Sequence, residues 1–433
     1  HKVDTDGDGR SDWYEASAAF TDPSDKAEAP ALPYPLPDPD PADLGAADKP
    51  VKVYIMSGQS NMVGIGYVNG DKPGTLETIA KREGKFPNLV DDSGNWTERK
   101  DVIYKGVVTA TAEGPLTAGQ GASNTRIGPE LGFGHVMGWF HDEPVLILKA
   151  SQGNRSLGWD FLPPGSERFQ VGELTYAGYG DRPSSWLTDS EGPVPGVWYA
   201  GKQYDDCLRD EADMGMPEWT PAYDYNKNTL IKHKGVPYTA SSAHTSGDAT
   251  EPGVGADWES AWSQKSMFNA ADILGDDGTL QHLPEEDNNL NGRRYEIAGF
   301  CWWQGHKDGG QQGTGEAGVH AARYEENLVA LINALRKDFN APDAPVVVAT
   351  VGFGGGTWEP GSSGDTIFKA QMAVGDPAQH PDLAENVASV DTTGFWRTLS
   401  ESPGGQGFHY NNNAETYMLV GDAMGRAMIR LKK

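Results

Sequence analysis

The sequence predicts a three-layer α/β/α fold, in which a doubly wound, five-stranded parallel sheet carries helices on both faces. Two observations support this fold class. Short apolar runs with the length of buried strands recur along the chain, and segments with helical apolar spacing separate them. Strands that alternate with helices form a parallel sheet, because each helix returns the chain to the edge where the previous strand began.

The five predicted strands are continuous apolar runs. They occupy residues 51–57, 144–151, 296–303, 345–352 and 386–391. The two clearest predicted helices place Leu328, Leu331, Ile332, Leu335 and Phe339 on one stripe, and Tyr417, Val420, Met424, Met428 and Leu431 on another. Ligands of doubly wound sheets bind beyond the carboxyl ends of the strands, so we expect the functional site there.

The predicted domain organisation has four parts. Residues 1–21 form a metal-binding segment, and residues 22–50 form a linker whose prolines exclude a helix or sheet. The α/β domain is discontinuous and comprises residues 51–200 and 270–433. Residues 215–265 form a small all-β insert, because short aromatic and β-branched runs alternate there with Gly, Asn and Pro turns.

The N-terminal stretch DTDGDGRSDWYE, residues 4–15, has the spacing of an EF-hand calcium loop. Glycine at the sixth position permits the sharp turn of such a loop. The predicted oxygen ligands are Asp4, Asp6, Asp8, Arg10 through its carbonyl, Asp12 and Glu15. A disordered acidic leader does not account for this spacing, so we predict a structural Ca²⁺.

Composition excludes several classes of function. The chain has 62 acidic and 35 basic residues and a formal net charge of −27, which disfavours nucleic acid as a partner. No 18-residue apolar run predicts a membrane span. The chain begins at His1, and we expect a processed or trimmed form that is secreted or periplasmic. Its two cysteines, Cys207 and Cys301, allow one disulfide but do not imply it.

Four segments at predicted strand ends or before the last helix carry residues suited to acyl transfer. In VYIMSGQSNM, residues 53–62, Ser60 follows the first strand, where it is either a nucleophile or part of a plain turn. KASQGNRSLGW places Gly153 after the second strand, and CWWQGHKDG places Gln304 after the third. With the N–H of Ser60, these supply three candidate oxyanion donors. GFHYNNNAETY places His409 just before the final helix.

These segments resemble the SGNH hydrolases, specifically the sialate O-acetylesterase and acetyl-xylan esterase branch. The matching elements are SGQSNM (57–62), GPELGFG (128–134), WWQG (302–305) and the late His409, in order along the chain. The resemblance covers roughly residues 50–200 and 270–433. It implies that Ser60 is the nucleophile, His409 the general base, and Gly153 and Gln304 oxyanion donors.

Two positions depart from the pattern of that branch. It usually has Asp three residues before the histidine, where this chain has Gln406, which carries no charge to stabilise an imidazolium. Asp391 is the best substitute because it also follows a strand, Glu401 is the next, and a backbone carbonyl would leave a Ser–His dyad.

The second departure is WWQGHKD in place of WHQGESD, so that His306 replaces an acidic residue and Asp308 is retained. This change leaves the substrate preference open. The candidate substrate-binding residues are Asn61, Trp303, His306 and Asp308.

The insert is similar to chitin-binding-type carbohydrate-binding modules. The matching positions are Trp219, Tyr225, Tyr238, Pro252, Gly253 and Trp258. However, Ala243, His244 and Thr245 stand where tandem aromatics would grip a sugar. Two alternatives therefore remain, a sugar-binding module and a vestigial one that shapes the cleft.

The sequence as a whole predicts a secreted carbohydrate O-acetylesterase that acts on an acetylated polysaccharide or oligosaccharide. Ser60 attacks the acetyl ester and His409 removes its proton, with no cofactor in the chemistry. Two alternatives remain open: an esterase for sialate or other acyl sugars, and a non-catalytic carbohydrate-binding protein on an esterase-like scaffold. A purely structural wall protein would leave the four ordered motifs unexplained.

Overall fold

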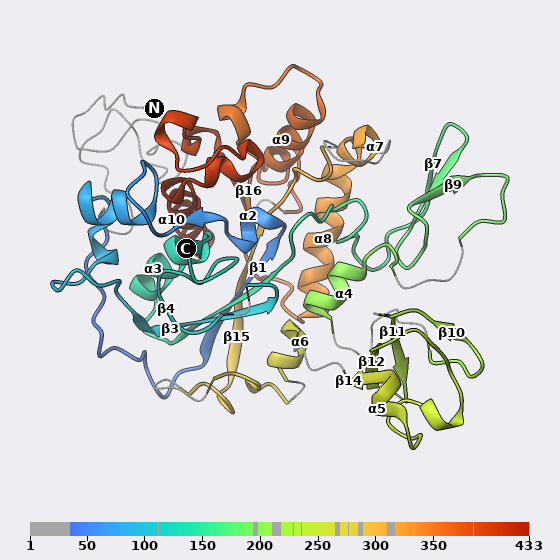
Figure 1. Ribbon diagram of the computed structural model, residues 1–433. Helices are drawn as coiled ribbons and strands as arrows, with labels where there is room; N and C mark the ends of the chain where they lie inside the picture. The colour runs from blue at the N-terminus through green and yellow to red at the C-terminus, as the bar shows by residue number, and fades with distance from the viewer. Residues whose placement is uncertain are drawn as a thin grey trace. The chain divides into compact units, whose positions relative to one another are not determined.

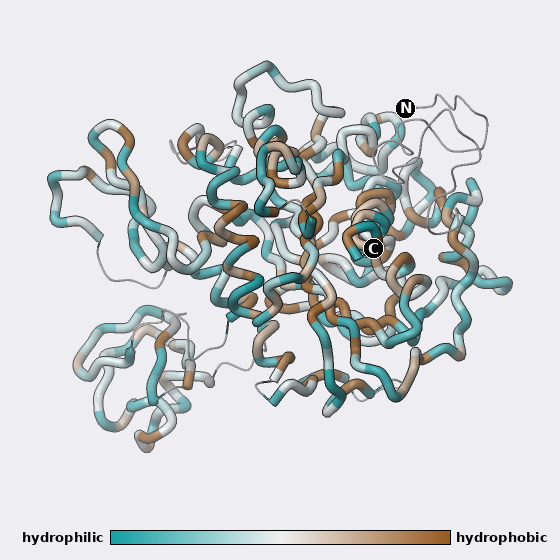
Figure 2. Tube along the Cα trace, turned by 180° about the vertical axis from the view of Figure 1, so that it is seen from behind, coloured by the Kyte–Doolittle hydropathy of each residue, from teal (hydrophilic) through white to brown (hydrophobic). Residues whose placement is uncertain are grey.

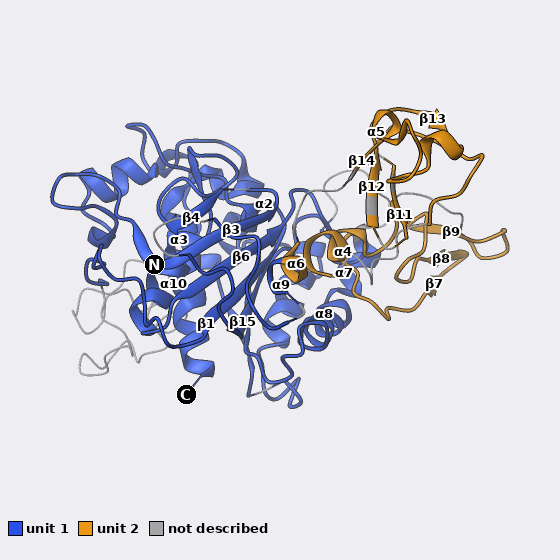
Figure 3. Ribbon diagram, turned by 90° about the horizontal axis from the view of Figure 1, so that it is seen from below, with its two compact units in different colours: residues 1–158, 273–433 blue, residues 159–272 orange. Residues whose placement is uncertain are grey.

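The structure is a computed structural model, and the chain forms two compact units. It describes residues 35–432 except 111, 194–197, 210–217, 228, 235, 265–268, 276, 285–288, 310–316 and 384. Unit 1 comprises residues 1–158 and 273–433, and unit 2 comprises residues 159–272 (Figure 3). Residues 159–200, which the sequence analysis assigned to the α/β domain, thus belong to unit 2. The predicted calcium loop lies outside the described residues and stays a prediction.

Unit 1 is built on a seven-stranded sheet with the order β17-β16-β15-β1-β6-β3-β4 (Figure 1). Neighbouring strands run parallel except for the antiparallel pair of β3 and β4. The strands are β1 (Val51–Gly58), β3 (Arg99–Val108), β4 (Glu113–Leu116), β6 (Val145–Ser151), β15 (Tyr295–Trp303), β16 (Val346–Ala349) and β17 (Val387–Val390). The predicted α/β fold class and its five strands are confirmed. The sequence analysis missed β3 and β4, because charged residues such as Asp101 and Lys105 interrupt the apolar run of β3.

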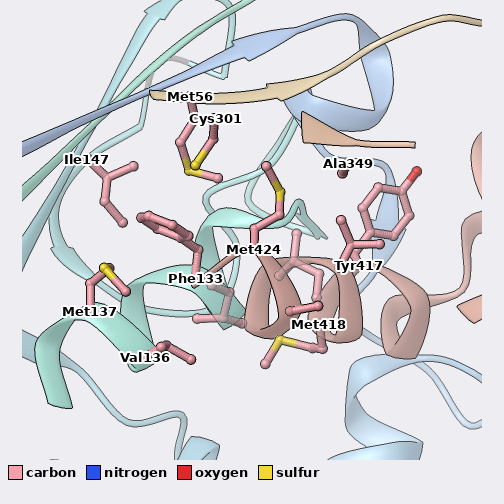
Figure 4. Close-up of a cluster of buried hydrophobic side chains, with 14 of the residues drawn as sticks. Met56, Phe133, Val136, Met137, Ile147, Cys301, Ala349, Tyr417, Met418 and Met424 are labelled. Carbon is pink, nitrogen blue, oxygen red and sulfur yellow. The ribbon is translucent and has the colours of Figure 1, made fainter. Parts of the chain in front are cut away.

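Helices cover both faces of this sheet. On one face, α3 (Glu130–Phe140) and α10 (Ala414–Leu431) pack together over the strands, and Met56 and Cys301 of the sheet meet Phe133 and Met424 (Figure 4). On the other face, Phe300 of β15 contacts Phe339 at the end of α8 (Tyr324–Asp338). Hydrophobic residues accordingly concentrate along the strands and the packed helices (Figure 2).

Local sequence explains the close contact between α3 and α10. The side chain of Asn413 caps α10 by accepting hydrogen bonds from the N–H groups of Glu415 and Thr416. A Cβ atom at Gly421 would lie 2.1 Å from the carbonyl oxygen of Pro129, so only glycine permits this crossing. Within GPELGFG, a Cβ atom at Gly132 would lie 2.4 Å from the carbonyl oxygen of Met418, so this motif is in part a packing motif.

The remaining helices and strands are short. In unit 1 they are α2 (Ser60–Val63), β2 (Gly66–Tyr67), β5 (Arg126–Ile127), α7 (Ala317–Ala322), α9 (Ser363–Ala373), a π-helix (Glu77–Arg82) and 3-10 helices at Pro87–Leu89, Phe353–Gly356, Thr393–Phe395, Leu399–Glu401 and Gly407–Asn412. No described helix is both long enough and apolar enough to cross a membrane.

Unit 2 contains small antiparallel sheets. One sheet consists of β7 (Phe169–Val171), β8 (Leu174–Tyr176) and β9 (Ser185–Leu187), and two others are formed by β10 (Asp224–Tyr225) with β13 (His244–Thr245), and by β11 (Leu230–His233), β12 (Val236–Ala240) and β14 (Trp262–Gln264). Its helices are α4 (Lys202–Leu208), α5 (Trp258–Ala261), most of α6 (Ala270–Ile273) and a 3-10 helix at Asp248–Thr250. A separate core, which contains Ile231, Tyr238 and Trp262, holds the strands of the predicted insert together.

Neither cysteine is in a disulfide, and both are buried. Cys207 lies in α4 of unit 2, where its sulfur accepts a hydrogen bond from Gln203. Cys301 lies in β15 of unit 1, and burial raises the pKa of its thiol. The disulfide that the sequence allowed is therefore not formed.

Candidate active site

Ser60 follows β1, the strand at which the strand order of the sheet switches from one side to the other. β1 pairs with β15 on one side and β6 on the other, so loops from both halves of the sheet meet at its carboxyl end. Ser60 is the first residue of α2, immediately after this end. A Cβ atom at Gly58, whose φ is 152°, would lie 2.2 Å from the carbonyl oxygen of Trp303. Glycine is thus required for the turn that presents the serine.

Ser60 and His409 are in direct contact. The Oγ atom of Ser60 lies 2.9 Å from Nε2 of His409, although 349 positions separate the two residues in the sequence. A nucleophile and its general base require a distance of this size. The structure therefore brings together the two residues predicted to carry the chemistry.

The loop that carries His409 is held by Asn61. Asn61 donates from Nδ2 to the carbonyl oxygen of Phe408 at 3.2 Å, and its Oδ1 accepts from the Tyr417 hydroxyl at 2.8 Å. Asn61 is only 3% exposed. In place of the predicted substrate contact, its amide groups connect the nucleophile helix to the histidine loop.

Gln406 occupies the place expected for a carboxylate. Its Oε1 lies 3.1 Å from Nδ1 of His409, so the ring carries its proton on Nδ1 and leaves Nε2 free to accept from Ser60. The prediction of Asp391 for this role is wrong. Its Oδ1 accepts instead from the N–H of Thr393, beside β17. Glu401 accepts from the N–H and hydroxyl of Thr398 at the start of a 3-10 helix.

Two backbone amides lie beside Ser60. The N–H of Ser60 has no acceptor within α2, because the first residues of a helix lack one. Gly153 follows β6, and a Cβ atom there would lie 3.9 Å from Cβ of Ser60. These are two of the three oxyanion donors predicted, and their placement beside the nucleophile suits that role.

Gln304, the third predicted oxyanion donor, points elsewhere. Three acceptors lie within hydrogen-bonding distance of its Nε2: Oε1 of Gln59 at 3.0 Å, the carbonyl oxygen of Arg155 at 2.9 Å and Oδ2 of Asp308 at 2.6 Å. Its Oε1 accepts from the Tyr324 hydroxyl. An amide nitrogen has only two hydrogens, so none is left for an oxyanion and the prediction is wrong. Gln304 instead connects Gln59, next to the nucleophile, to the loop after β6.

Asp308 and Trp303, both predicted to contact substrate, are buried. Asp308 accepts hydrogen bonds from the N–H groups of Leu157 and Gly158 at 2.8 Å each, and burial raises the pKa of its carboxyl. It therefore fixes the loop that carries Gly153. Trp303 belongs to the core and donates to the carbonyl oxygen of Thr350 at 3.2 Å. Both predictions of substrate contact are corrected: these side chains support the site from within.

A buried ion pair is hydrogen-bonded to the end of the nucleophile helix α2. Lys149 of β6 lies 2.8 Å from Oε2 of Glu130, and neither side chain is exposed to solvent. Lys149 also donates to the carbonyl oxygen of Val63, the last residue of the nucleophile helix. Glu130 in turn accepts from the N–H of Gly128. Glu130 belongs to the GPELGFG motif, but neither its role nor that of Lys149 is predicted from the sequence.

The surroundings of His409 keep its imidazole neutral. Burial, followed by the repulsion that His306 exerts when it is protonated, lowers the pKa of His409 to about 4. Since only the neutral ring accepts the serine proton, kcat/KM should be level above about pH 5 and fall as the pH decreases through about 4. A pH profile of the parent enzyme with an acidic limb at pH 6.5 or above would contradict this.

Gln406→Glu keeps an oxygen at Nδ1 of His409 and adds a negative charge. The charge favours the imidazolium, so the acidic limb of the kcat/KM profile should move to higher pH. The matched variant Gln406→Ala removes the acceptor without adding charge, and should lower kcat without this upward shift. Equal profiles for Gln406→Glu and the parent would show that residue 406 does not act on His409.

A serine–histidine pair beside two backbone amides, at the carboxyl end of a doubly wound sheet, defines the class of serine ester hydrolases. Residues 281–430 match the family described as "Carbohydrate esterase, sialic acid-specific acetylesterase". This match confirms the predicted resemblance over that part of the chain and supports a carboxylic ester hydrolase.

Eight chains of solved structures match this chain, among them the following three. A protein from Arabidopsis thaliana shares 14% identity, with 88% of this chain and 98% of that chain covered and a TM-score of 0.40. A carbohydrate acetylesterase from Xanthomonas citri shares 11%, with 84% and 54% covered and a TM-score of 0.36. NanS shares 12%, with 88% and 98% covered and a TM-score of 0.38. No curated protein matches the chain in sequence.

Proposed function

We propose that this protein removes acetyl groups from hydroxyls of a polysaccharide or oligosaccharide. The observation that carries the proposal is the 2.9 Å contact between Ser60 Oγ and His409 Nε2, beside the amides of Ser60 and Gly153. In this proposal the protein is secreted or periplasmic, and a Ca²⁺ bound by residues 4–15 has a structural role.

The reaction has two acyl transfers. Ser60 Oγ attacks the acetyl carbonyl carbon while His409 takes its proton, and the oxyanion accepts hydrogen bonds from the two amides. His409 then gives the proton to the sugar oxygen as the carbon–oxygen bond breaks. In the second transfer, His409 takes a proton from water, which attacks the acetyl-enzyme. The proton returns to Ser60 Oγ as acetate leaves.

Acetate release from a panel of acetylated polysaccharides tests the proposal. Release by the parent chain alone, and not by Ser60→Ala, would establish an O-acetylesterase, and the preferred polymer would indicate the substrate. If neither protein released acetate, even from a small activated acetate ester, the enzymatic proposal would be abandoned.

A non-catalytic carbohydrate-binding protein is the second candidate. The uncharged Gln406 beside His409 favours it, because no carboxylate stabilises the imidazolium there. Covalent labelling separates the two candidates: a fluorophosphonate should modify Ser60 in an assembled active site, whereas a scaffold without activity should stay unlabelled.

A further inference from the structure

We infer that a cavity on the His409 side of Ser60 holds the sugar ring of the leaving alcohol, and that this ring is an uncharged pyranose. The inference rests on the proposed function and adds a substrate class to it. It is independent of the small insert in unit 2, since every residue that carries it lies in unit 1.

The order of the strands decides on which side the alcohol lies. Gly153, which supplies an oxyanion N–H, follows β6 on one side of β1. The His409 loop lies on the opposite side, where the Tyr410 hydroxyl oxygen accepts a hydrogen bond from the N–H of Gly352, just after β16, and Phe408 stacks on His306 after β15. His409 must deliver its proton to the leaving oxygen. The sugar therefore leaves from the β15 and β16 side, and the oxyanion faces β6.

A cavity of about 440 Å³ opens on that side. Its aromatic lining residues are His306, Phe353, Trp358, Trp396 and Phe408. His306 and Phe408 are nearly parallel, with ring centroids 5.2 Å apart, and Phe408 also contacts His409. The cavity thus begins at Phe408, the residue that precedes the catalytic histidine. Its size is in the range of small-molecule sites, and its flat aromatic walls suit the apolar faces of a sugar ring.

One polar atom in this wall needs a partner. Nε2 of His306 is buried and makes no hydrogen bond within the described part of the chain. Burial also lowers the pKa of His306, so its ring is neutral and has one donor and one acceptor nitrogen. A sugar hydroxyl can serve either kind of nitrogen. A carboxylate can only accept, and a neutral imidazole offers it no charge.

The cavity also lacks a counter-charge for an acidic sugar. None of its described lining residues is Lys, Arg, Asp or Glu. The N-terminus of α9 reaches it through Ser362, Ser363 and Gly364, but Asp365 in the first turn already places a carboxylate there. Lys307 and Arg155 contact Gln59 and Gln304 through their backbone atoms, but neither is among the described lining residues of the cavity. The net charge of −27 further disfavours anionic glycans.

Three acetate esters with different alcohols test the inference. They are an O-acetylated neutral methyl pyranoside, an O-acetylated sialic acid and ethyl acetate, whose alcohol is too small to reach the aromatic walls. For the parent, kcat/KM should be highest for the neutral pyranoside. In Trp358→Ala, the ratio of kcat/KM for the pyranoside to that for ethyl acetate should fall roughly tenfold, and Trp358→Phe should restore most of it.

Trp139→Ala is the matched control, because Trp139 is 42% exposed on α3 and should leave the ratio at the parent value. If Trp358→Ala does not fold, Phe408→Ala gives the same comparison, since Phe408 is 36% exposed. An unchanged ratio in the cavity variants, or a parent that prefers the sialic acid ester, would overturn the inference. Failure of the parent on all three esters would instead contradict the proposed function.

Discussion

Replacing Ser60 with alanine is expected to lower kcat/KM for acetyl esters by about 10⁴- to 10⁶-fold, with little change in stability. The hydroxyl is partly exposed at the start of α2, and its hydrogen bond is to His409. Its removal therefore abolishes acyl-enzyme formation without opening a cavity in the core. Steady-state kinetics with a small acetate ester, together with thermal unfolding, measure the two effects.

His409→Ala should cause a loss of similar size, and the double variant should be hardly worse than either single variant. The two residues act as one unit, because proton transfer from Ser60 to His409 requires both side chains. Activity that fell less than about 100-fold in Ser60→Ala would show that another group is the nucleophile. Additive losses in the double variant would argue against a shared step.

Of the variants proposed for this protein, Lys149→Met is expected to lose the most stability, about 3–5 kcal/mol in the free energy of unfolding. The change leaves the Glu130 carboxylate in the core without its ion-pair partner, and both side chains are fully buried in the native protein. It also removes a hydrogen bond to the carbonyl oxygen of Val63 at the end of the nucleophile helix. Activity should therefore decrease as well. Urea unfolding of unit 1, followed by tryptophan fluorescence, measures the stability loss.

Two variants control this measurement. Lys52→Met removes a partly exposed ion pair with Glu296 and should cost less than about 1 kcal/mol. The double variant Lys149→Met/Glu130→Gln no longer buries an unpaired charge, so its loss should be smaller than the sum of the single losses. Equal losses in the free energy of unfolding for Lys149→Met and Lys52→Met would show that the buried ion pair stabilises the fold no more than the partly exposed one.

The sequence by itself determined the central strands, the helices that follow them, the positions of Ser60 and Gly153 at strand ends, and the position of His409 just before the final helix. These features depend on local patterns: apolar runs form buried strands, and glycine permits turns that other residues do not. The chain order of the strands then brings their carboxyl ends to one edge of the sheet. The contact between Ser60 and His409 follows from this topology.

Only the tertiary structure decided the direction and burial of the polar side chains around that contact. Gln304 and Asp308 follow a strand end, as a substrate-binding residue would, yet they bond to the loop after β6. Gln406 lies three residues before His409 and accepts from its ring although it carries no charge. The physical reason is that a polar group excluded from water bonds to whatever partner the packed loops bring near, and that partner is not encoded by local sequence.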